Sequence, residues 1–133
     1  MSWRDEGKFD AAIAVHDEVV RRFGQEGQGG EYVVGVLNRK GRILQQQGEL
    51  GAAIEVYDDI ARRVGPANTY YAALALVRKG EILAQQGKFK EAIALYDEVE
   101  QRFGKTAGYP SIRDLVRKAA EARAAASGRL SSQ

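Results

Sequence analysis

Two features of the sequence could in principle support chemistry, namely a single histidine and the pairs of adjacent carboxylates that recur in three similar segments. His16 is the one imidazole that could act as a base near neutral pH. No serine lies at a spacing that would pair with it as a nucleophile, and the chain has no cysteine. Disulfides, thiol nucleophiles and cysteine-bound zinc are therefore excluded. We interpret His16 as a packing residue of a helix and expect no enzymatic activity.

The paired carboxylates recur at the same place in three similar segments, as Asp17-Glu18, Asp58-Asp59 and Asp97-Glu98. General acid–base catalysis needs such groups at one site, whereas these pairs are one repeat apart. We predict that they lie on solvated helix surface and form ion pairs with bases of neighbouring helices, namely Arg39, Lys40, Arg78 and Lys79. The pairs are too dispersed for a metal site, and the glycines of residues 27–30 match no phosphate-binding loop. We therefore expect no metal and no cofactor.

The elements that carry these residues form a repeat. Residues 7–24, 48–65 and 87–104 superpose without gaps, and the first and third share 12 of 18 positions. The offsets are 41 residues from Gly7 to Gly48 and 39 residues from Gly48 to Gly87. A second repeated unit lies between them, in which residues 37–41 align with 76–80 and 115–119. Self-similarity at such a period is the signature of a repeat architecture.

Both units have the periodicity of amphipathic helices. In the first unit, which we name B-type, apolar residues recur every three or four positions, as at Ala53, Tyr57 and Ile60. The second unit, which we name A-type, keeps the same period and ends at Gly48 or Gly87, where glycine permits a left-handed turn. We predict one all-α domain over residues 1–133, with helices at 8–23, 31–47, 49–64, 68–86, 88–103 and 109–126.

These residues resemble the tetratricopeptide repeat family over about residues 7–123. The resemblance rests on small residues of neighbouring helices, Gly41, Gly80 and the alanines at 12, 53 and 92, with large partners such as Tyr57 and Tyr96. It implies a right-handed superhelical solenoid of antiparallel helix pairs. The repeats of 39–41 residues are longer than the usual length of about 34. We expect the additional residues to extend the start of the A-type helix and the loop before it.

The register of the repeats is shifted by half a repeat. On the alignment, residue 1 falls within an A-type helix, with Trp3 equivalent to Leu44, and residues 109–126 form an A-type helix without a following B-type helix. The chain could be a piece of a longer array, or a second copy could complete its ends. Alternatively, Trp3 covers the exposed stripe of helix 8–23 and helix 109–126 is a terminal cap. The sequence leaves these alternatives open.

The resemblance also implies a non-catalytic scaffold that binds a protein or peptide on the concave face formed by A-type helices. Carried over by position, this face comprises Asn38, Arg39, Arg42, Gln45, Gln46, Val77, Arg78, Glu81 and Gln85. Some members clamp a terminal carboxylate, and Arg39, Arg78 and Arg117 match one basic position of that clamp. The asparagine position holds Arg42 or Glu81, so we do not predict the clamp. The alternative function is a self-assembling unit, a head-to-tail homo-oligomer that forms a ring or filament through its terminal helices.

Composition narrows the classes of partner and compartment. Lys and Arg number 20 against 18 for Asp and Glu, a formal charge of +2, which argues against a nucleic-acid partner. No apolar run approaches the roughly 18 residues of a membrane span, so we expect no membrane partner. The first residues lack the profile of a signal peptide. We accordingly expect a soluble, cytoplasmic protein.

Overall fold

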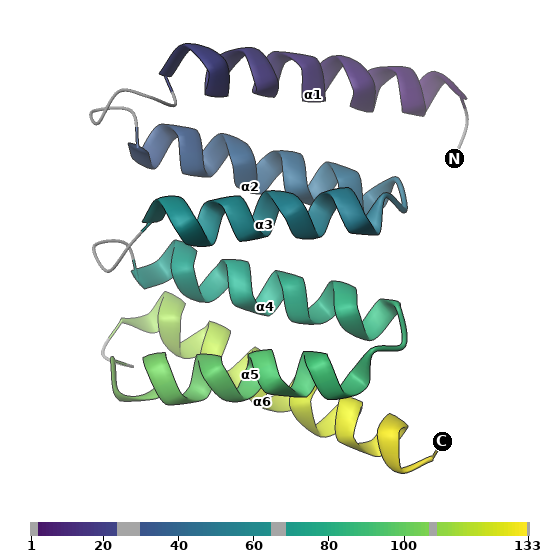
Figure 1. Ribbon diagram of the computed structural model, residues 1–133. Helices are drawn as coiled ribbons and strands as arrows, with labels where there is room; N and C mark the ends of the chain where they lie inside the picture. The colour runs from purple at the N-terminus through teal and green to yellow at the C-terminus, as the bar shows by residue number, and fades with distance from the viewer. Residues whose placement is uncertain (1–2, 24–29, 65–68, 107–108, 133) are drawn as a thin grey trace. The chain divides into compact units, whose positions relative to one another are not determined.

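The computed structural model describes residues 3–23, 30–64, 69–106 and 109–132 (Figure 1). Over these residues the chain is helical, with no strand, which confirms the all-α prediction. The elements in chain order are α1 (Trp3–Phe23), α2 (Gly30–Gln46), α3 (Leu50–Val64), α4 (Thr69–Gln85), α5 (Phe89–Phe103), the short 3-10 helix η3 (Gly104–Thr106) and α6 (Pro110–Ser131). Helices α1, α3 and α5 are the B-type helices, and α2, α4 and α6 are the A-type helices.

The helices form two compact units. The first comprises Met1–Val64, with α1, α2 and α3, and the second comprises Gly65–Gln133, with α4, α5 and α6. The ends of the four internal helices lie within one residue of their predicted bounds. A single domain over residues 1–133 stays a prediction.

The first helix differs from its prediction at its start. Gly48 and Gly87 take the left-handed conformation, each with a φ of 79°, and end α2 and α4. Gly7 occupies the equivalent position but lies inside α1, which begins at Trp3 rather than at residue 8. Glycine permits a left-handed turn without imposing one. Residues 3–7 are therefore not the end of a separate A-type helix, and the predicted boundary there is wrong.

In the first unit, α2 packs against both α1 and α3. The turn from α2 into α3 is a Schellman motif, in which the Glu49 N–H donates to the Leu44 carbonyl at 2.9 Å and the Gly48 N–H donates to the Gln45 carbonyl at 3.1 Å. Beyond this turn, α3 returns along α2 and the Tyr57 ring covers Gly41, whose absent side chain permits the close approach. The predicted small-to-large pairing of neighbouring helices is thus present in this pair.

In the second unit, α5 packs against α4 and α6, and α6 also contacts α4. The turn from α4 into α5 repeats the Schellman motif at Gly87, and Gly80 lies against Tyr96 as Gly41 lies against Tyr57. Figure 1 shows α6 crossing α5 at an angle. Helix α6 continues to Ser131, five residues beyond the predicted end at residue 126.

Helix α6 forms its ion pair with the preceding B-type helix through a residue that is not equivalent to the one that α2 uses. Lys40 of α2 pairs with Asp17 of α1, and the residue of α6 equivalent to Lys40 is Lys118, which is exposed. Asp97 of α5 instead pairs with Arg123 of α6. Five residues correspond to about 140° around a helix. The buried residues of α6 are Ile112, Leu115, Ala119 and Ala126. The first three are equivalent to Val34, Leu37 and Gly41, which are buried in α2.

Candidate partner-binding surfaces

His16 lies buried in the first unit, as its predicted packing role requires. Its Nδ1 atom has no hydrogen-bond partner among the described residues. Burial lowers the pKa of His16, and the positive charges of Arg39 and Lys40 lower it further, against a smaller opposing effect of Asp17. The ring is therefore neutral at neutral pH and carries no charge into the helix interface. Among the described residues, no cluster of His, Asp and Glu side chains could hold a metal ion.

In the first and third repeats the two members of the carboxylate pair have different partners. The first member reaches another helix, in the pairs Asp17–Lys40 and Asp97–Arg123. The second member pairs with an arginine one turn later on its own helix, in the pairs Glu18–Arg22 at 2.9 Å, Asp59–Arg63 at 3.1 Å and Glu98–Arg102 at 3.3 Å. These pairings identify the carboxylates as surface ion-pair groups. The predicted pairing of Lys40 is confirmed.

The predicted pairings of Arg39 and Arg78 with carboxylates of B-type helices are not the ones observed. Arg78 pairs with Glu81 on its own helix, with 3.1 Å between Nη1 and Oε2. Arg39 has no carboxylate partner in the described part of the chain. The reason is geometric, since Lys40 lies one residue away from Arg39, and therefore about 100° around the helix, on the side that faces Asp17.

The predicted interaction residues of α2 are exposed or half-buried. Arg39, Arg42 and Gln46 are exposed and follow one another at intervals of three and four residues, which places them along one face. Asn38 and Gln45 are half-buried at the edge of this face. We name the five residues together the α2 face. The amide oxygen of Asn38 is buried and has no hydrogen-bond partner among the described residues.

The charge on the α2 face is not compensated within the described residues. Neither Arg39 nor Arg42 has a carboxylate partner there, whereas Arg22, Arg63 and Arg102 each pair with a carboxylate on their own helix. The α2 face therefore presents two guanidinium groups that are free to bind an anion. Arginine binds carboxylates in a planar, bidentate geometry that is stronger than a neutral hydrogen bond.

The equivalent residues of α4 are less available. Arg78 is neutralised by Glu81, and Gln85 is exposed. Glu81 also contributes, after burial, to raising the pKa of Tyr96 to about 12. Val77 is 2% exposed, so the prediction that it faces a partner is wrong. Its position follows the apolar stripe of α4, which is broader than that of α2 and includes Ala73 and Leu74 among its buried residues.

The structure adds a groove in the first unit that the sequence analysis missed. It has a volume of about 750 Å³ and lies among α1, α2 and α3. Apolar side chains line it together with three acidic and three basic ones, namely Ile13, Val20, Leu37, Leu44, Ala52, Val56, Asp17, Glu55, Asp59, Arg21, Lys40 and Arg62. Two pairs of these charges already neutralise each other, Asp17 with Lys40 and Asp59 with Arg62. No periodicity within one helix could reveal a groove built from three helices.

The comparisons with known proteins agree with the geometry. A family model described as tetratricopeptide repeat matches residues 4–68 and residues 38–107. Neither the curated proteins nor the solved structures give a significant match. Separately, none of the described helices is both long enough and apolar enough to cross a membrane.

Proposed function

Because the chain belongs to the tetratricopeptide repeat family, whose repeats generally mediate protein–protein interactions, we propose that it binds an acidic segment of a partner protein through the α2 face. The observation that carries this proposal is the pair of exposed guanidinium groups of Arg39 and Arg42 without a carboxylate partner among the described residues. Members of the family are generally not enzymes, and we infer that this chain has no catalytic activity and acts in the cytoplasm.

The chemistry of the α2 face indicates the kind of segment that fits. Arg39 and Arg42 lie one turn apart, so they can contact carboxylates at neighbouring positions of an extended peptide. Gln46 can both donate and accept. This combination selects a polar, acidic segment rather than an apolar helix.

A binding measurement tests this proposal. The probe is a labelled peptide of alternating Glu and Ser, with a matched peptide in which Gln replaces Glu, and binding is followed by fluorescence anisotropy. We expect the double variant Arg39→Glu with Arg42→Glu to weaken binding of the acidic peptide about tenfold or more, equivalent to about 1.4 kcal/mol. The control is Lys118→Glu together with Arg113→Glu on the exposed side of α6, which makes the same change of net charge. Equal binding by both double variants, or equal affinity for both peptides, would contradict the proposal.

Self-assembly through the terminal helices is the alternative. The observation that favours it is an incompletely buried stripe on α1, where Phe9, Ala12 and Ile13 are half-buried. The burial pattern of α6 argues against self-assembly, because the apolar stripe of α6 is buried within the second unit and its opposite face is polar. Light scattering at increasing protein concentration distinguishes the alternatives. A ring or filament grows with concentration, whereas a peptide-binding scaffold keeps the mass of one chain.

A further inference from the structure

One packing position of the B-type helices differs between the repeats in its acid–base chemistry. His16, the single histidine of the chain, occupies this position in α1, and Tyr57 and Tyr96 occupy it in α3 and α5. All three side chains are buried. An imidazole gains a charge between about pH 7 and pH 5, whereas a phenol stays neutral there. Of these three equivalent positions, the one in α1 is therefore the one that responds to mild acid.

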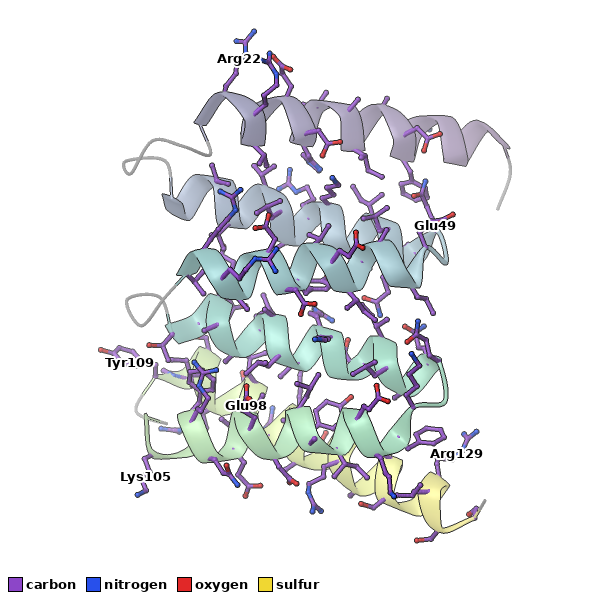
Figure 2. All side chains as sticks on the ribbon, in the orientation of Figure 1. Arg22, Glu49, Glu98, Lys105, Tyr109 and Arg129 are labelled. Carbon is purple, nitrogen blue, oxygen red and sulfur yellow. The ribbon has the colours of Figure 1, made fainter. Side chains whose placement is uncertain are left out.

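His16 lies at the contact between α1 and α2. Helix α2 is the described element that packs on α1, and the ion pair between Asp17 and Lys40 joins the two helices one residue after His16. Figure 2 shows side chains of both helices in the space between them. The His16 side chain is 8% exposed, so water has little access to it. A positive charge that forms on this ring must therefore be compensated by neighbouring groups of the protein.

The charged groups that act on His16 from both helices disfavour a positive ring. On α2 these groups are Arg39 and Lys40, both cations, and on α1 the group is Asp17. The favourable effect of Asp17 on a protonated ring is smaller than the unfavourable effect of Arg39. Asp17 is also already paired with Lys40. A proton on His16 thus adds a third positive charge to a contact that holds a single carboxylate.

Hydrogen bonding does not offset this repulsion at Nδ1. Both nitrogens of a protonated imidazole are donors, and the Nδ1 atom of His16 is buried without a hydrogen-bond partner among the described residues. A buried donor without an acceptor is costly. The next carboxylate along α1, Glu18, pairs with Arg21 and Arg22, and Figure 2 shows Arg22 directed away from α2. Glu18 is therefore engaged away from the contact that contains His16.

We propose that the contact between α1 and α2 is an acid-sensitive switch, in which a proton on the His16 ring separates α1 from α2 while α2 stays packed on α3. The groove of the first unit is the feature that this switch changes. Ile13 and Val20 of α1 and Leu37 and Leu44 of α2 line it, so the groove widens when the two helices separate. This regulation goes beyond the proposed binding of an acidic segment, and its test uses no peptide.

The direction of the pKa shift sets the pH range of the switch. Burial, followed by the charge of Arg39, lowers the pKa of His16 in the packed contact below the ordinary value of 6.5. The packed contact therefore prefers the neutral ring, whereas separation returns the ring to water and to its ordinary pKa. The contact keeps its full stability above pH 6.5 and loses stability as the pH falls below that value.

Amide hydrogen exchange of the whole chain, followed by mass spectrometry at pH 7 and pH 5.5, tests the switch. Rates are corrected for the intrinsic effect of pH on exchange, and most carboxylates remain ionised at both values. We expect the protection of α1 to fall by about threefold or more at pH 5.5, as local opening of one helix requires. The protection of α3, which has Tyr57 at the equivalent position, should change much less. His16→Tyr should remove the difference between α1 and α3.

A second pair of variants tests the charges without altering a buried residue. Arg39 and Arg42 are both exposed on α2 and lie one turn apart, but Arg39 acts on His16 and Arg42 is not among the groups that shift its pKa. Arg39→Gln should therefore reduce the loss of α1 protection at pH 5.5. Arg42→Gln makes the same change of net charge and should leave that loss as it is in the parent. This comparison keeps the test decisive if His16→Tyr folds poorly.

Three results would overturn the proposal. The corrected protection of α1 in the parent chain could be the same at pH 5.5 as at pH 7. Protection of α1 and α3 could fall equally, which would mean that acid unfolds the first unit as a whole. Finally, a folded His16→Tyr variant could lose α1 protection as the parent does, or Arg39→Gln could behave as Arg42→Gln does. None of these results depends on whether the α2 face binds an acidic segment.

Discussion

Gly41 of α2 and Tyr57 of α3 lie so close that a Cβ atom at residue 41 would come within 2.7 Å of the Tyr57 Cζ atom. Gly80 and Tyr96 repeat the relationship in the second unit, with 2.6 Å to Cε1. Real Cβ atoms do not approach other heavy atoms so closely, and the Tyr57 ring is almost fully buried, so it has no free space to move into. The closeness of each helix pair therefore depends on the absence of a side chain at one position.

This relationship predicts the effect of adding one methyl group. We expect Gly41→Ala to lower the free energy of unfolding by about 1–3 kcal/mol, because the methyl group overpacks the interface with Tyr57. Gly51→Ala is the matched control, since Gly51 is a helical, exposed glycine with no atom near a Cβ at that position. It should leave stability unchanged or slightly increased. Chemical denaturation measures both, and equal effects would contradict the close approach.

A second prediction concerns the small residues of B-type helices. Ala53 is fully buried in α3, so Ala53→Leu should destabilise the protein by about 1–3 kcal/mol through overpacking. Glu55 lies two residues away and is exposed, so Glu55→Leu should have little effect on stability. Thermal melts followed by circular dichroism compare the two variants. Equal destabilisation by both would mean that the burial pattern of α3 is wrong.

The buried histidine predicts a dependence of stability on pH. Since folding lowers the pKa of His16, the unfolded chain binds a proton more readily than the folded chain. The neutral ring is compatible with folding above pH 6.5, the ordinary pKa of histidine, and stability falls as the pH drops below it. His16→Tyr should remove this part of the pH dependence. It should also be neutral or stabilising at pH 7, because tyrosine occupies the position in the other two repeats. Unfolding curves of parent and variant between pH 7 and pH 5 test the difference, and parallel curves would contradict it.

The pair Asp17–Lys40 joins two helices of the first unit and predicts a small coupling energy. Its Asp17 side chain is about half exposed, so solvent and salt screen the attraction. A double-mutant cycle with Asp17→Asn and Lys40→Met should give a coupling of about 0.2–1 kcal/mol that shrinks in high salt. A coupling that is absent at low salt, or that salt leaves unchanged, would show that the pair does not contribute in this way.

The local features of the fold could be predicted because they depend on residues close together in the sequence. Apolar spacing predicted the ends of the four internal helices to within one residue. Gly48 and Gly87 form the expected turns. Gly7 aligns with Gly48 and Gly87 but does not end a helix. A glycine permits a turn, while the packing of its neighbours determines whether the helix ends there. The burial of His16 followed from its equivalence to Tyr57 and Tyr96.

The sequence by itself determined the helical repeat and the family, because periodicity, glycine turns and small-to-large positions are properties of the chain alone. Only the tertiary structure decided which members of the predicted interaction set are available. Val77 is buried and Arg78 is neutralised, whereas Arg39 and Arg42 have no carboxylate partner among the described residues. The tertiary structure also decided that α6 forms its ion pair with α5 through Arg123 rather than Lys118. It further decided that Val15 is exposed while its equivalent Val56 is buried. The physical reason is that repeat equivalence fixes residue type, whereas exposure and ion pairing depend on which helix lies opposite in space.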